Sequence, residues 1–82
     1  MKRLIDLTII SPQSQESMHV EWIQLEGPHG EFVICYDHAP IISIIEAQTA
    51  LHYQKESGSS INIIVNGGII SFLNNQATII LD

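Results

Sequence analysis

Apolar and polar residues alternate along much of the chain, and this period of two is typical of half-buried β-strands. In the first such segment Ile5, Leu7 and Ile9 are separated by polar side chains. Ser11-Pro12 ends this segment, because proline cannot donate a hydrogen bond to a strand ladder. Turn-forming clusters separate the segments that follow. The pattern predicts strands over 4–10, 18–25, 31–35, 41–45, 49–55, 61–65, 69–73 and 77–81.

Several segments carry more specific expectations. Gln13–Ser17 is polar and predicts a loop, whereas the almost wholly apolar segment Ile61–Val65 predicts a strand buried on both faces or in a sandwich core. Residues 46–51 could form one helical turn, but a strand over 49–55 fits better because six residues make a marginal helix. Asn74-Asn75 predicts a two-residue hairpin turn, because asparagine tolerates a positive φ.

Eight short strands at regular spacing, with almost no helix, indicate an all-β fold: a sandwich or a barrel. The chain has 82 residues, and we expect one small domain over residues 1–82. A chain of this size buries only about 60% of the surface that its unfolded form exposes, so its stability margin is thin.

The composition favours a protein partner. Charged residues make up 15% of the chain, against about 25% in an average soluble protein, which suggests that a partner covers part of the surface. The net charge of -6 disfavours binding to nucleic acid and direct anchoring to anionic lipid. A single cysteine fits a reducing compartment, and no apolar run approaches the length of a membrane span, so we expect a cytoplasmic protein.

The sharpest chemical alternative is a metal or thiol site. Cys35, Asp37 and His38 lie close together in sequence, with His29 nearby, and zinc accepts all three ligand types. The spacing lacks a paired-ligand motif, and the competing interpretation makes Cys35 a buried small hydrophobe and His38 a hydrogen-bonded loop residue. Asn66-Gly67-Gly68 lacks the lysine of a phosphate loop and predicts a glycine break between strands. We therefore expect no catalytic residue, no cofactor and no metal.

Four motifs, in a fixed order, carry a family resemblance. They are Ile23-Gln24-Leu25-x-Gly27-x-x-Gly30-Glu31-Phe32, His38-Ala39-Pro40-Ile41-Ile42, Gly67-Gly68-Ile69 and Asn75-x-Ala77-Thr78-Ile79-Ile80-Leu81. Together they resemble the amino-terminal β-sandwich of the epsilon subunit of F-type ATP synthases, whose mitochondrial counterpart is subunit delta. The resemblance covers essentially the whole chain.

The resemblance implies a flattened, mostly antiparallel sandwich of about ten strands. It also implies a non-catalytic subunit of the central stalk, held peripherally at the cytoplasmic face of the membrane between the gamma subunit and the ring of c subunits. The implied contacts to the c-ring are His29, Gly30 and Glu31, and those to gamma are Ser11, His38, Ala39, Pro40 and Ile42. An acidic surface would suit basic loops on the ring.

The chain also departs from the family pattern. Members normally add a carboxy-terminal helical hairpin that inhibits ATP hydrolysis, and because the sequence ends at Asp82 we expect no such hairpin and no inhibition through it. The family usually has proline at Glu26, glycine at Val33, Pro-Gly at Tyr36-Asp37 and glycine near Gln48. A free-standing adaptor derived from this sandwich, and self-association of the isolated domain, remain alternatives at this point.

Overall fold

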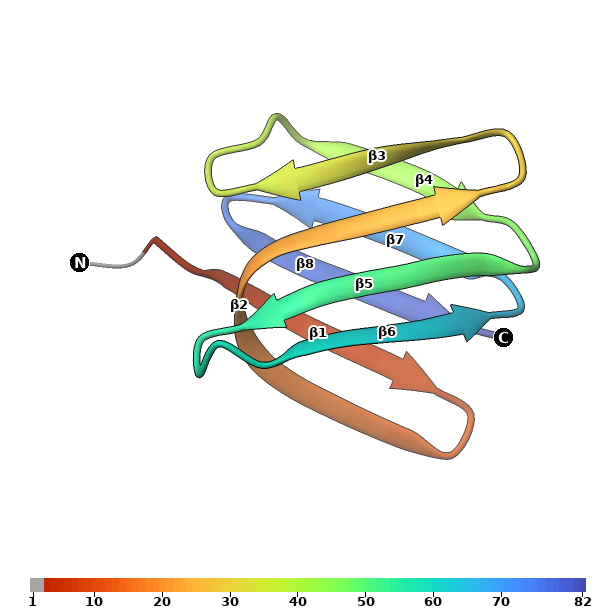
Figure 1. Cartoon of the computed structure of the whole chain (residues 1–82), viewed down its shortest axis with the longest axis horizontal. Helices are drawn as coiled ribbons and strands as arrows, with labels where there is room; N and C mark the ends of the chain where they lie inside the picture. The colour runs from red at the N-terminus through yellow and green to blue at the C-terminus, as the bar shows by residue number, and fades with distance from the viewer. Residues whose placement is uncertain (1–2) are drawn as a thin grey trace.

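The computed structural model describes residues 3–82, and its regular elements there are eight β-strands (Figure 1). The strands are β1 (Ile5–Ser11), β2 (Ser14–Gly27), β3 (Gly30–Cys35), β4 (Ile41–Ile45), β5 (Thr49–Lys55), β6 (Ser60–Val65), β7 (Gly68–Leu73) and β8 (Gln76–Leu81). The all-β class and the eight strands predicted from periodicity are confirmed. The count of about ten strands is too high for this part of the chain, because the 14-residue β2 runs unbroken through both layers.

The strands form one curled sheet with the order β4-β7-β8-β1-β2-β5-β6, and β3 pairs with the free side of β2. The sheet folds into two layers because β2 changes partners along its length. Its first half pairs with β1, and after an irregularity between Val20 and Trp22 its second half pairs with both β3 and β5. Strands β3, β2, β5 and β6 therefore make one layer, which faces the viewer in Figure 1.

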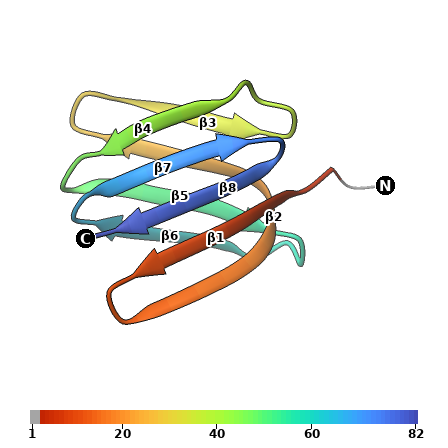
Figure 2. The same ribbon diagram turned by 180° about the vertical axis from the view of Figure 1, so that it is seen from behind.

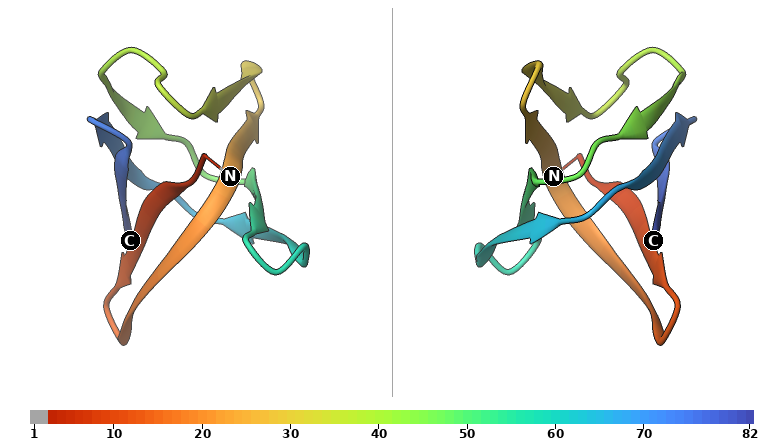
Figure 3. Two further views of the ribbon diagram at one scale, coloured as in Figure 1. Left: turned by 90° about the vertical axis from the view of Figure 1, so that its left-hand side faces the viewer. Right: turned by 90° about the vertical axis from the view of Figure 1, so that its right-hand side faces the viewer.

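Strands β4, β7, β8 and β1 make the second layer, which faces the viewer in Figure 2. Seen from the side in Figure 3, the two layers join at the β1–β2 hairpin and are bridged at the other edge by the segment between β3 and β4. All pairings are antiparallel except β1 with β8, which is parallel. The prediction of a mostly antiparallel sandwich is therefore confirmed.

Alternate residues of both layers point inward and form one apolar core. Phe72, Ile34 and Ile79 are almost fully buried in it. The buried hydrophobic residues are Ile5, Leu7, Ile9, Val20, Ile23, Leu25, Ile34, Ile45, Leu51, Tyr53, Val65, Ile70, Phe72, Ala77 and Ile79. Burial of this apolar surface is the main term that stabilises the fold.

The prediction of a loop over 13–17 is wrong for most of that segment. Strand β2 begins at Ser14 and pairs in register with β1 from Ser11↔Ser14 onward. This part of the hairpin extends beyond the core, so its residues are exposed on both faces and lack the apolar alternation that marks a strand. The β1 ladder satisfies its backbone, and hydroxyl pairs such as Ser11 Oγ with Ser14 Oγ, 2.9 Å apart, add to it.

Of the two environments predicted for Ile61–Val65, burial on both faces is wrong, and only Val65 belongs to the sandwich core. Strand β6 lies at the end of the sheet order, and of its residues only Val65 is buried. Ile63 and Ile64 are exposed, because an edge strand at the rim of the sandwich has no layer above its outer side. An apolar run of this length indicates a strand but does not say whether the strand is central or peripheral.

Tyr53 gives the fold a testable pH dependence. Its side chain lies in the core, and this burial, with the negative charge of Glu16 as a smaller cause, raises the pKa of the hydroxyl above its usual range. The unfolded chain loses this proton near pH 10, before the folded chain does, so folding stability should fall as the pH rises above about 10. Urea unfolding at pH 8 and pH 11 should show a smaller loss for Tyr53→Phe than for the wild type. An equal loss in both proteins would contradict this assignment.

Candidate docking surfaces

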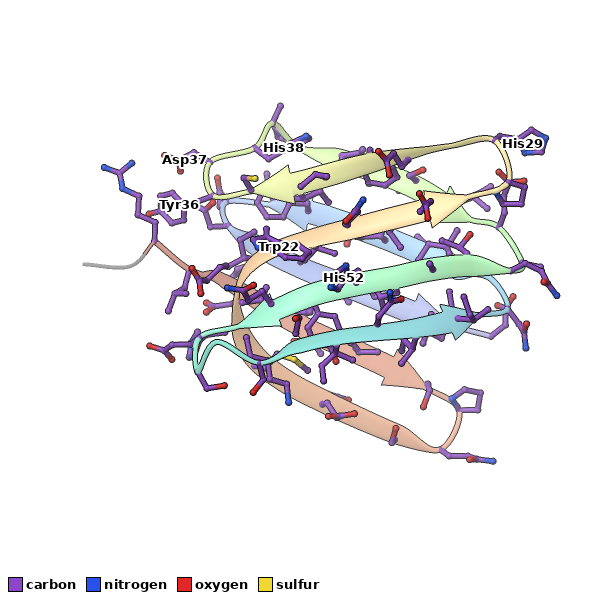
Figure 4. The ribbon with its side chains drawn as sticks, viewed as in Figure 1. Trp22, His29, Tyr36, Asp37, His38 and His52 are labelled. Carbon is purple, nitrogen blue, oxygen red and sulfur yellow. The ribbon has the colours of Figure 1, made fainter. Side chains whose placement is uncertain are left out.

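The first candidate surface is the tight turn between β2 and β3, which carries the predicted ring contacts His29, Gly30 and Glu31. All three residues are exposed. Gly30 has φ +135°, a left-handed conformation that favours glycine. His29 lies at the opposite end of the molecule from Asp37 and His38 (Figure 4). The turn is therefore free to meet one partner while the segment around His38 meets another.

Two interactions hold this turn in place. His29 Nδ1 lies 2.8 Å from Glu46 Oε2, which links the turn to the segment that follows β4 in the other layer. Gln24 donates a hydrogen bond from Nε2 to Glu31 Oε2 over 2.9 Å. The Glu31 carboxylate is thus fixed along the strand but stays exposed to solvent.

Acidic side chains gather at this end of the sandwich. Glu26 and Glu31 are direct cross-strand partners in the β2–β3 hairpin. The two-residue turn Pro28-His29 sets these two side chains opposite each other. Like charges directly opposite in a sheet are destabilising, so a positive group placed between them would relieve a repulsion.

The second candidate surface begins with the predicted gamma contacts His38, Ala39 and Pro40, which lead into β4 and are exposed. The His38 amide donates to the carbonyl oxygen of Cys35 over 3.0 Å, and the His38 ring meets Phe72 edge-on, with centroids 6.0 Å apart. An apolar groove opens beside this segment, lined by Pro40, Ile41, Ile42, Ser71, Phe72 and Leu73.

A row of isoleucines extends this surface across the outer face of the second layer. Ile44 pairs with Ile69, Ile69 pairs with Ile80, and Ile80 pairs with Ile10, so the row crosses β4, β7, β8 and β1 in register. Ile42 lies on the same face of β4 as Ile44, and these two side chains are 81% and 77% exposed. We call Ile10, Ile42, Ile44, Ile69 and Ile80 the isoleucine face.

The isoleucine face connects predicted gamma contacts that lie far apart. Pro40 and Ile42 stand at one corner of the outer layer, and Ser11 follows Ile10 at the diagonally opposite end of the row. Ile42 and Ser11 were predicted from the sequence, but the isoleucines between them were not. The available signal was the lack of polar residues at the outward positions of β4, where a solvent-facing strand would alternate.

The sequence allowed two interpretations of Cys35, as part of a metal or thiol site or as a buried small hydrophobe. Cys35 is exposed, so its interpretation as a buried small hydrophobe is wrong: it alternates with the buried Ile34 and points outward. Within residues 3–82 the structure contains no group of three or more histidine, cysteine, aspartate or glutamate side chains that could hold a metal ion. The same residues include no helix long and apolar enough to span a membrane.

Comparison with known proteins gives the family. Residues 4–82 match the family model described as ATP synthase, Delta/Epsilon chain, β-sandwich domain. The chain belongs to this family. It is 30% identical over 84 residues to the ATP synthase epsilon chain of Lactobacillus gasseri, covering 99% of this chain and 58% of that relative. It is 35% identical over 69 residues to the epsilon chain of Wolinella succinogenes, covering 83% of this chain and 52% of the relative.

Solved structures show the same fold for this epsilon-family sandwich. A chain in the mitochondrial ATP synthase of Euglena gracilis, resolved with OSCP, F1 and the c-ring, superposes with a TM-score of 0.85 at 17% identity, covering 96% of this chain and 51% of that one. A chain in the central stalk and c-ring of the Tetrahymena thermophila enzyme gives 0.76 at 14% identity, covering 99% and 63%. By length, this chain spans about 58% of the Lactobacillus relative.

Proposed function

We propose that this chain is a non-catalytic central-stalk subunit of an F-type ATP synthase. It links the gamma subunit to the c-ring and supports the coupling of ion translocation to ATP synthesis. The observation that carries the proposal is the isoleucine face, an exposed apolar surface that crosses the outer layer and includes Ile42, one of the residues expected to contact gamma. The relatives that are named ATP synthase epsilon chain, and the fold shared with a chain of the Tetrahymena central stalk, support it.

The isoleucine face suits contact with an apolar surface of the gamma subunit. Its five side chains lie on one side of four neighbouring strands, so a partner can bury them together without a change in the sandwich. Each square ångström of apolar surface removed from water contributes about 25 cal/mol. The exposed segment His38–Pro40 continues the same surface and offers polar groups at its rim, as protein interfaces commonly do.

The acidic turn suits the ring. Glu26 and Glu31 face each other across the hairpin, and a lysine or arginine from a loop of the ring would lie favourably between them. Gly30 of the turn and Ile44 of the isoleucine face line the same pocket, so the two partners would bind next to each other at this end of the sandwich. A two-layer sandwich that shares the continuous β2 is stiff enough to transmit torque between them. In this proposal the subunit lies at the cytoplasmic surface of the membrane, held by its partners and not by lipid.

Reversal of one charge tests the ring contact. Glu31→Lys should weaken association of the gamma-bound chain with isolated c-rings at least tenfold, because it puts a positive charge where the proposed partner is basic. Binding to immobilised c-rings at low and physiological salt is the measurement. Glu16→Lys makes the same charge change on the exposed β1–β2 arm and should have little effect. Equal binding by wild type and Glu31→Lys would remove the ring contact from the proposal.

A further inference from the structure

We propose that Asp37 and Asn75 form a clasp that holds the gamma-facing segment, residues 38–42, in the shape in which it docks. The inference rests on the proposed function, since it assigns a positioning role for the same docking surface. Neither residue contacts the proposed partner in this account. They act by fixing the connection between β3 and β4.

Two reciprocal hydrogen bonds form the clasp. The backbone amide of Asp37 donates to Asn75 Oδ1 over 2.6 Å, and Asn75 Nδ2 donates to Asp37 Oδ1 over 2.9 Å. The two residues are 38 positions apart in sequence. The clasp therefore joins the β3–β4 connection to the tip of the β7–β8 hairpin, whose strands carry part of the isoleucine face.

Asn75 is itself anchored to a third element. Its carbonyl oxygen accepts a hydrogen bond from the Asp6 amide in β1 over 2.9 Å. Its φ is +60°, and that of Asp37 is +65°, so both residues occupy the left-handed region that asparagine and aspartate tolerate better than most residues. The fold thus presents the Asn75 amide to the loop from a fixed position, and the Asp37 conformation turns its backbone amide toward it.

The loop needs such a support because its two strands have different partners. Strand β3 pairs with β2 and strand β4 pairs with β7, so residues 36–40 cross from one layer to the other. Apart from the clasp, the described contacts of this crossing include the His38 amide bond to Cys35 and the edge-on contact of the His38 ring with Phe72. A loop ordered before binding avoids the entropy loss of ordering on contact, which weakens association.

Exchanging the two side chains tests the clasp. Asn75→Asp sets a second carboxylate against Asp37 and removes the Nδ2 donor, so affinity for the gamma subunit should fall about tenfold. Asp37→Asn keeps an acceptor oxygen and should bind like the wild type. The double variant Asp37→Asn/Asn75→Asp puts the donor on the other partner and should recover the affinity. Hydrogen exchange of the backbone amides of His38 and Ala39 in the free chain should speed up in Asn75→Asp alone.

Each outcome decides one point. The clasp is wrong if Asn75→Asp binds gamma and exchanges like the wild type, or if the double variant is no better than Asn75→Asp. If Asn75→Asp does not fold, Asp37→Gly carries the test, because it keeps the backbone donor and the positive φ while removing the acceptor, and should speed exchange of the His38 and Ala39 amides. If the wild type itself does not bind gamma, the proposed function fails, and the exchange measurements still decide whether the clasp orders the loop.

Discussion

Replacing Ile44 by aspartate should abolish detectable binding to the gamma subunit while the domain stays folded. Ile44 is 77% exposed in the free chain and starts the row that continues through Ile69. A carboxylate there would be buried against an apolar partner without a compensating charge, which is strongly unfavourable. We expect affinity to fall by at least about 100-fold, as it does for central interface residues. Calorimetric titration of gamma with the variant is the measurement.

Ile64→Asp provides the matched control for this experiment. Ile64 is also an exposed isoleucine, 65% accessible, but it lies on β6 at the edge of the other layer. The same substitution there should leave gamma binding within about twofold of the wild type. Equal losses for Ile44→Asp and Ile64→Asp would show that general solubility or charge, and not the isoleucine face, controls association.

Gly68→Ala should unfold a large fraction of the protein. Gly68 has φ +155°, and a Cβ built on it would collide with the carbonyl oxygen of Ile80 in β8. That oxygen belongs to a neighbouring backbone between core strands and cannot move aside as a side-chain tip could. The expected loss is more than about 3 kcal/mol, a large share of the stability of a small domain. Urea unfolding followed by circular dichroism measures it.

Gly58→Ala separates the steric effect from the loss of a flexible residue. Gly58 also has a positive φ, +97°, but a Cβ there would meet nothing within 4 Å. This substitution should cost only about 1–2 kcal/mol, the strain of an alanine in the left-handed region. A Gly68→Ala midpoint equal to that of Gly58→Ala would contradict the close approach of Gly68 to β8.

Local sequence patterns predict most strands well because their causes are local. The alternation of Ile5, Leu7 and Ile9 is visible within seven residues, and the Asn74-Asn75 turn adopts the positive φ that its composition suggested. The glycine break at Gly67-Gly68 was located correctly, but not its cause. Gly68 is required by the carbonyl oxygen of Ile80, twelve residues away, and no local pattern contains that contact.

The two docking surfaces differ in the same way, because one is made of residues adjacent in sequence and the other is made by strand pairing. The turn residues His29, Gly30 and Glu31 are adjacent in sequence, so a short sequence motif can identify them. The isoleucine face joins Ile10 to residues of β4, β7 and β8, and depends on three strand registers that alternation cannot fix. Alternation shows that Ile10 points away from Ile9, but not which neighbour it meets.

Isoleucine methyl NMR of this chain with the gamma subunit of the same cell can show whether the isoleucine face docks on gamma. Selective labelling gives one resonance for each δ1 methyl, and the isoleucines lie on both layers and in the core. On addition of gamma, we expect large shifts for Ile10, Ile42, Ile44, Ile69 and Ile80, with Ile63 and Ile64 unchanged. No binding, or shifts confined to Ile63 and Ile64, would contradict it.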